Sequence, residues 1–162
     1  MKTLHIVRHG KSSWDLPGVA DIDRPLLDKG VQNNYHMAER LKNNYEIPDL
    51  IISSPANRAI HTAIILARAI GLSLGCIQIN DNIYECNPAT IIDMILEIPE
   101  NIKSLLIVGH NPTFTDLANL FLLNKIDNLP TSGIVSLQFQ TKNWKIINTM
   151  PVFSKIDYPK NN

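Results

Sequence analysis

Short apolar runs alternate with amphipathic helical patterns along most of the chain. Four of these runs, at residues 4–7, 49–52, 76–79 and 105–108, predict buried β-strands. Apolar residues recur at helical spacing within residues 31–45, 59–70 and 114–121. Strands that alternate with helices are typical of a parallel sheet that is covered on both faces. The pattern therefore predicts a three-layer α/β/α fold with a mostly parallel central sheet.

The end of the chain departs from this alternation. Residues 134–139 alternate with a period of two, and residues 144–147 follow after a turn, so we expect the two segments to form an antiparallel C-terminal hairpin. Residues 151–162 are polar and contain two prolines, which predicts a C-terminal tail that either straps the domain or is loose. No shift in composition divides the chain. We therefore expect one domain over residues 1–162, without a cap domain.

The composition of the chain mainly excludes classes of partner and location. The formal net charge is zero, which argues against broad electrostatic capture of nucleic acid or of an anionic membrane. The two cysteines, Cys76 and Cys86, form no CxxC motif, and we expect both to be reduced thiols. No apolar run at the start reaches the ~7–15 residues of a secretory signal, and none approaches the ~18 residues of a membrane span. We therefore expect a cytoplasmic protein.

Unusual polar segments follow three of the predicted strands. Arg8-His9-Gly10 follows the first, Ser53-Ser54-Pro55 with Arg58 follows the second, and Gly109-His110-Asn111-Pro112 follows the fourth. The carboxyl ends of parallel strands meet at one edge of a sheet, so two histidines, two arginines and two helix N-termini should come together. Arginine forks and helix N-termini bind phosphate oxygens, and a neutral imidazole is a nucleophile. The set predicts a phosphoryl site worked by histidine. No carboxylate cluster accompanies it, so we expect no metal and no cofactor.

These motifs, in this order, resemble those of the histidine phosphatase superfamily, which is also called the phosphoglycerate mutase-like fold. Arg8-His9-Gly10 is similar to its first signature, residues 53–63 to its second arginine motif, and residues 108–112 to its second histidine motif. Residues 8–15, the segment Asp23-Arg24-Pro25-Leu26 and residues 131–134 resemble the SixA-like phosphohistidine phosphatase branch. The similarity extends from Met1 to about Phe139, which is nearly the whole domain.

The resemblance implies a role for each matching residue. His9 is expected to be the nucleophile that becomes phosphorylated, with His110 donating to the phosphoryl group. The groups expected to bind the substrate are Arg8, Arg24, Arg58, His110 and the N–H groups near Gly10. The expected cycle consists of two in-line transfers, first from the substrate to His9 and then from His9 to water.

Two positions depart from the pattern of the superfamily. Many members use a glutamate or aspartate as the acid that protonates the leaving oxygen. The candidate here is Glu85, whose alternative is a solvated loop carboxylate. Asp15 stands where members of this fold often place an asparagine that faces the phosphate, so we expect Asp15 either to turn away or to pair with an arginine.

The uncertain acid and the expected absence of a cap favour phosphohistidine on a partner protein as the substrate. A phosphoramidate bond to imidazole is more labile than an alkyl phosphate ester, and an open site suits a side chain on another protein. A small-molecule phosphomonoesterase of the same superfamily and a non-catalytic phosphate-binding module are the alternatives. We expect neither nucleic acid nor a membrane as a partner. His5, His36 and His61 are expected to be packed or surface side chains without a role in the site.

Overall fold

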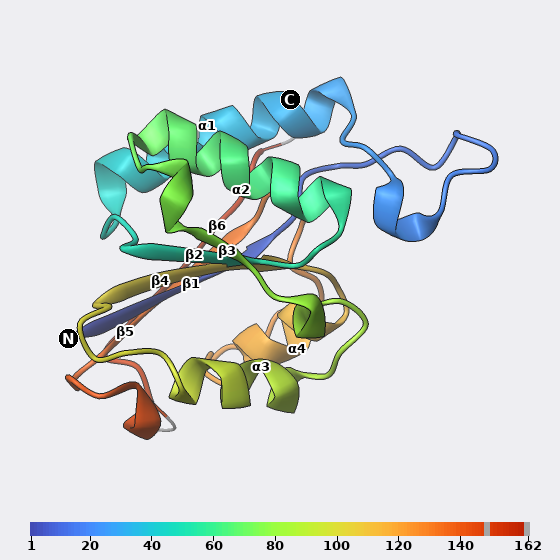
Figure 1. Cartoon of the computed structure of the whole chain (residues 1–162). Helices are drawn as coiled ribbons and strands as arrows, with labels where there is room; N and C mark the ends of the chain where they lie inside the picture. The colour runs from blue at the N-terminus through green and yellow to red at the C-terminus, as the bar shows by residue number, and fades with distance from the viewer. Residues whose placement is uncertain (148–149, 161–162) are drawn as a thin grey trace.

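The computed structural model describes residues 1–147 and 150–160 and has a six-stranded mixed sheet at its centre (Figure 1). The strands are β1 (Lys2–Arg8), β2 (Leu50–Ser53), β3 (Ile77–Ile79), β4 (Ser104–Gly109), β5 (Ile134–Phe139) and β6 (Phe153–Asp157). Their order is β3-β2-β4-β1-β5-β6. Strands β1 to β4 are parallel, whereas β5 is antiparallel to β1 and β6 is antiparallel to β5. The predicted α/β fold is confirmed, and β1 to β4 overlap the four predicted runs.

The α-helices of the described ranges cover both faces of the sheet (Figure 1). On one face lie α1 (Asp28–Asn44) and α2 (Asn57–Ile70), and on the other lie α3 (Pro88–Leu96) and α4 (Thr113–Asn119). None of these helices is long and apolar enough to cross a membrane.

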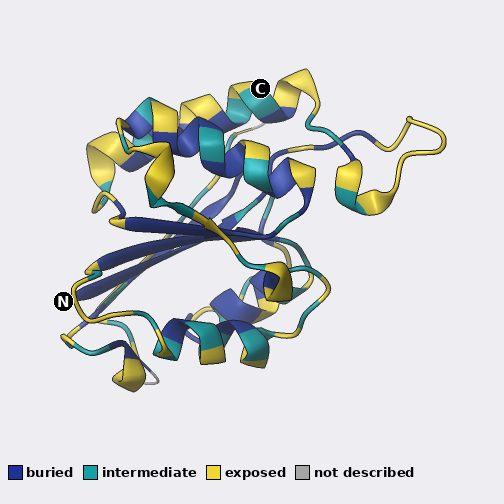
Figure 2. Cartoon of the chain, in the orientation of Figure 1, coloured by how far each residue is buried: buried dark blue, intermediate teal, exposed yellow. Residues whose placement is uncertain are grey.

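The alternation of side chains along the strands divides the core into two layers. In β4, Leu106 and Val108 pack with α1 and α2, whereas Leu105 and Ile107 pack with α3 and α4. Every residue of β4 is buried, which is why this strand is a continuous apolar run in the sequence. In Figure 2 the central strands are coloured as buried, and the outer faces of the helices are coloured as exposed.

The predicted second strand of the C-terminal hairpin is wrong. Residues Trp144–Ile146 form a short 3-10 helix instead. The indole of Trp144 is fully buried in the core, and its Nε1–H donates to the carbonyl of Ile102 at 2.8 Å. Core packing of this large aromatic side chain therefore replaces the expected strand pairing.

The antiparallel partner of β5 is β6, which lies within the segment where the sequence predicts a tail. Asp157, the last residue of β6, accepts hydrogen bonds from the guanidinium of Arg40 and from the hydroxyl of Tyr45. These contacts attach the strand to α1 and to the residue that follows it. The segment therefore straps one edge of the sheet, while Asn161 and Asn162, the last residues of the expected tail, lie outside the described residues.

Candidate functional site

Three neighbouring strand ends bring the predicted site residues together. Arg8 is the last residue of β1 and pairs with Gly109 at the end of β4, so His9 and His110 leave the sheet side by side. Strand β2 ends beside β4, and the chain then enters α2, whose first turn contains Arg58. The residues line a pocket of about 620 Å³. Its lining includes the basic side chains Arg8, His9, Lys11, Lys29, Arg58 and His110 and no aspartate or glutamate of the described ranges.

His9 is held in one tautomer, with the lone pair on Nε2. Its Nδ1 lies 2.7 Å from the carbonyl oxygen of Gly10. A carbonyl can only accept, so Nδ1 carries the proton and Nε2 carries the lone pair. The Nε–H of Arg58 donates to this Nε2 at 3.3 Å. Burial, together with the positive charge of neighbouring groups, lowers the pKa of His9 to about 3, so the ring is neutral at physiological pH.

His110 faces His9, with 5.1 Å between the ring centroids. Its Nε2 is hydrogen-bonded to the hydroxyl of Ser54 at 2.7 Å. Its Nδ1 is buried and has no hydrogen-bond partner among the described residues. Burial lowers the pKa of His110 to about 4, and Arg58 contributes to the decrease. The site thus contains two neutral imidazoles in contact.

Arg8 supplies a second group without a partner. Its Nη1 donates to the carbonyl of Leu129 at 2.9 Å, which fixes the orientation of the guanidinium. Its Nε is buried and has no partner within the described part of the chain. A buried polar group left unpaired costs about 1–3 kcal/mol. Arg8, Arg58 and His110 line the same pocket, so the arrangement is suited to a phosphoryl group.

Arg24 contacts residues around the pocket, of which Ser12 and Trp14 line it. It donates from Nη1 to the hydroxyl of Ser12 and to the carbonyl of Ser13, both at 2.9 Å. Its guanidinium stacks on Trp14 at 3.5 Å from the ring centroid. Its Nε pairs with the carboxylate of Asp21 at 3.0 Å. Arg24 is not among the residues that line the pocket, and its described contacts support the loop, while its expected contact with the substrate stays a prediction.

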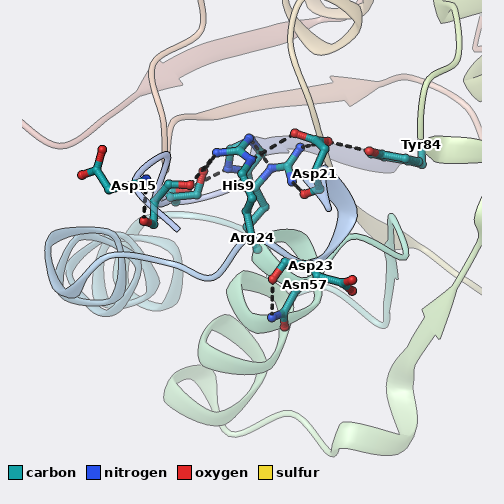
Figure 3. Close-up of polar contacts among 11 residues, drawn as sticks. His9, Asp15, Asp21, Asp23, Arg24, Asn57 and Tyr84 are labelled. Carbon is teal, nitrogen blue, oxygen red and sulfur yellow. Dashed lines mark hydrogen bonds and ion pairs between the residues drawn. The ribbon is translucent and has the colours of Figure 1, made fainter. Parts of the chain in front are cut away.

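Asp21 is the residue that the sequence analysis missed. It opens a 3-10 turn (Asp21–Asp23), and its carboxylate pairs with Arg58 Nη2 at 3.1 Å while its main-chain carbonyl accepts from Arg58 Nη1 at 2.7 Å. The hydroxyl of Tyr84 donates to the same carboxylate (Figure 3). The hydrogen bond from Tyr84 and the two arginines hold the pKa of Asp21 far below its usual range, and the contact raises the pKa of Tyr84 to about 12. The spacing of three residues between Asp21 and Arg24 was the signal available in the sequence.

Two expected contributions, those of Glu85 and of the N–H of Gly10, are not made in the pocket, and Asp15 also lies outside its lining. Glu85 is exposed at a left-handed backbone position with φ of 53°, and it does not line the pocket. The N–H of Gly10 donates to the hydroxyl of Thr62 at 3.0 Å, so it is not free for a phosphoryl oxygen. Asp15 is exposed and lies outside the pocket lining, as in the first of the two arrangements expected for it (Figure 3).

Comparison with known proteins places the chain in one family. The model for the histidine phosphatase superfamily (branch 1) matches residues 4–105. An uncharacterised protein of Mycobacterium tuberculosis is 32% identical over 142 residues, which cover 82% of this chain and 86% of the relative.

Solved structures give the same assignment of fold. A structure described as the phosphohistidine phosphatase SixA from Agrobacterium tumefaciens is 29% identical, with a TM-score of 0.76, over 84% of this chain and 90% of that one. The mycobacterial glucosyl-3-phosphoglycerate phosphatase is 15% identical, with a TM-score of 0.63, over 97% of each chain.

Proposed function

The chain belongs to the histidine phosphatase superfamily, and we propose that it removes phosphate from phosphohistidine on a partner protein, with His9 as the nucleophile. The observation that carries the proposal is the tautomer of His9. Its Nε2 holds a lone pair inside a basic pocket, because its proton lies on Nδ1, which donates a hydrogen bond to the carbonyl of Gly10. A nucleophile needs this lone pair, and a phosphoryl group needs the surrounding positive charge.

In the first transfer, the Nε–H of Arg58 shifts from Nε2 of His9 to a phosphoryl oxygen, and Nε2 attacks phosphorus in line with the bond to the substrate imidazole. The new N–P bond forms as the old one breaks, and the substrate imidazole leaves as a neutral ring when its other nitrogen carries a proton. Arg8, Arg58 and His110, which line the pocket, bind the equatorial oxygens. No acid is required for such a leaving group. The exposed position of Glu85, outside the pocket lining, supports a phosphoramidate rather than an ester as the substrate.

In the second transfer, water attacks the phosphoryl group on His9. The N–P bond breaks, the water loses a proton to solvent or to phosphate, and inorganic phosphate leaves. The hydrogen bond from Nδ1–H to Gly10 keeps the phosphorylated ring protonated on its other nitrogen. His9 therefore departs as a neutral imidazole, ready for the next cycle.

The expected single domain without a cap supports a protein substrate, because an open mouth admits a side chain that projects from another surface. A second candidate is a small-molecule phosphomonoesterase. The pocket volume of about 620 Å³ lies in the range that holds small ligands, and small-molecule phosphatases share the fold.

Labelling of the enzyme tests the mechanism. The protein is incubated with a ³²P-labelled phosphohistidine protein or with an aryl phosphate, and the reaction is quenched within one turnover. We expect acid-labile, base-stable label on the enzyme, absent in His9→Ala and present in the matched control His36→Ala, whose histidine is exposed on α1. Label that persists in His9→Ala would overturn the nucleophile, and equal turnover of both substrates would overturn the preference for phosphohistidine.

A further inference from the structure

The guanidinium of Arg58 is held from two sides. On the pocket side its Nε–H donates to Nε2 of His9 at 3.3 Å. On the opposite side its two terminal nitrogens donate to Asp21, one to the main-chain carbonyl and the other to the carboxylate (Figure 3). A guanidinium has five N–H groups. The contacts to Asp21 use two of them, so two others, and the Nε–H once His9 attacks phosphorus, can donate to a phosphoryl group without displacing Asp21.

Asp21 also balances charge at this point of the fold. The side chains of Arg58 and Arg24 are only 6% and 9% exposed, and the carboxylate of Asp21 bridges them. Two guanidiniums that converge on one carboxylate repel each other, and the shared negative charge offsets that repulsion. The hydrogen bond from Tyr84 adds to the stabilisation of the carboxylate, so Asp21 remains ionised while a substrate is bound.

We propose that Asp21 is a positioning residue that acts through Arg58. It turns the Nε–H edge of the guanidinium toward His9, and its charge offsets part of the charge of Arg58 so that product phosphate is released. The proposal rests on the proposed function of the pocket as a phosphoryl site. It assigns a role to a carboxylate that lies outside the pocket lining and that touches neither His9 nor the reacting phosphorus by any described contact.

The direct test is the affinity for inorganic phosphate, measured by titration calorimetry. Asp21→Asn keeps the shape and the main-chain carbonyl but removes the charge. We expect the dissociation constant of phosphate to fall by roughly fivefold, because one half-exposed negative charge beside a bound anion is removed. The matched control is Asp23→Asn, which removes the same charge from the same 3-10 turn. Asp23 is exposed, and its carboxylate forms no described ion pair, so we expect a change below about twofold.

Kinetics separate this role from a purely structural one. With an aryl phosphate as substrate, Asp21→Asn should lower both KM and the inhibition constant of inorganic phosphate without raising kcat. The reason is that the phosphoryl group of the substrate and the product phosphate are both bound more tightly. Asp21→Glu restores the charge and should return phosphate affinity to within about twofold of the wild type. A purely structural carboxylate would instead raise KM in both variants and lower their thermal stability.

Each outcome decides between the two proposals. Wild-type protein that binds no phosphate at millimolar concentration would overturn the phosphoryl site itself. The role of Asp21 alone would be overturned if the wild type binds phosphate but Asp21→Asn binds it no more tightly than Asp23→Asn does, or less tightly than the wild type does.

Discussion

His5 lies in the middle of β1 and His9 directly follows its last residue, and their environments share most properties that are used to recognise catalytic histidines. Both are buried, and burial lowers the pKa of both, to about 4 for His5 and about 3 for His9. They differ in tautomer. His5 donates from Nε2 to the carbonyl of Glu46 and accepts at Nδ1 from the hydroxyl of Ser136, both at 2.8 Å. His9 donates from Nδ1 and leaves Nε2 facing Arg58 in the pocket.

The comparison teaches that a low pKa does not identify the functional histidine. Both rings are neutral for the same reason, which is desolvation. The partner of the lone pair distinguishes them. In His5 it is a hydroxyl group within the sheet, whereas in His9 it is a cation that a phosphoryl group can engage instead. His5 is thus a satisfied structural residue, as expected from the sequence.

The largest effect expected is on turnover. His9→Ala should lower kcat/KM by at least about 10⁴-fold, because it removes the nucleophile. His5→Ala should leave kcat/KM within about threefold per folded molecule, because its ring lies away from the pocket lining. Single-turnover assays at equal concentrations of folded protein measure both. A comparable loss in the two variants would erase the distinction between them.

Stability should respond in the opposite way. His5→Ala should lower the free energy of unfolding by about 3 kcal/mol, since it leaves a cavity and removes the partner of the Ser136 hydroxyl and of the Glu46 carbonyl. That corresponds to a fall in Tm of about 6–12 °C for a domain of this size. His9→Ala should cost less than about 1 kcal/mol, because its partners remain accessible from the pocket. Urea unfolding of both variants provides the measurement. An equal loss of unfolding free energy in the two variants would contradict the structural role assigned to His5.

Acid should affect both histidines alike. In the unfolded chain a histidine titrates near its ordinary pKa of 6.5, whereas in the fold the pKa values of His5, His9 and His110 lie at about 4, 3 and 4. Between those values the unfolded chain binds protons that the folded chain does not, so stability decreases as pH falls below about 6.5. The slope should approach about 1.4 kcal/mol per pH unit for each histidine. His5→Gln should reduce the slope between pH 6.5 and 4.5, measured by urea unfolding at several pH values, and an unchanged slope would exclude His5 as a contributor.

The smallest effect expected is that of Glu85→Gln. Because Glu85 is exposed and lies outside the pocket lining, turnover of a phosphohistidine protein should change by less than about twofold. The aryl phosphate provides the internal comparison. A loss confined to the ester would identify Glu85 as its leaving-group acid and would restore the role that the sequence suggested.

The sequence was sufficient to predict the site residues that lie at the ends of strands. Arg8, His9 and His110 directly follow apolar strands, so parallel pairing alone predicts that they meet. Asp21 could not be predicted in the same way, because its partners Arg58 and Tyr84 reach it through the path of a loop rather than through a repeating pattern.

The end of the sheet was missed for a different reason. Most residues of β6 are exposed, so the strand lacks the alternation of polar and apolar residues that would reveal it in the sequence. The apolar segment at Trp144 resembles a strand in sequence, but it forms a 3-10 helix whose indole packs in the core. The sequence of a short apolar segment does not reveal whether it forms a strand or packs in the core as part of a turn.

Strand β1 lies at the interior of the sheet, and its two neighbours come from far along the chain: Thr3 pairs with both Ser104 and Gln138. Pairing over such separations makes folding slow, because long loops must close before any contact is gained. It also means that the backbone amides leading to His9 open only when the whole sheet opens. In hydrogen exchange, the amides of Ile6 and Val7 should therefore rank among the slowest in the protein, and recovery of catalysis during refolding should coincide with the final assembly of the sheet.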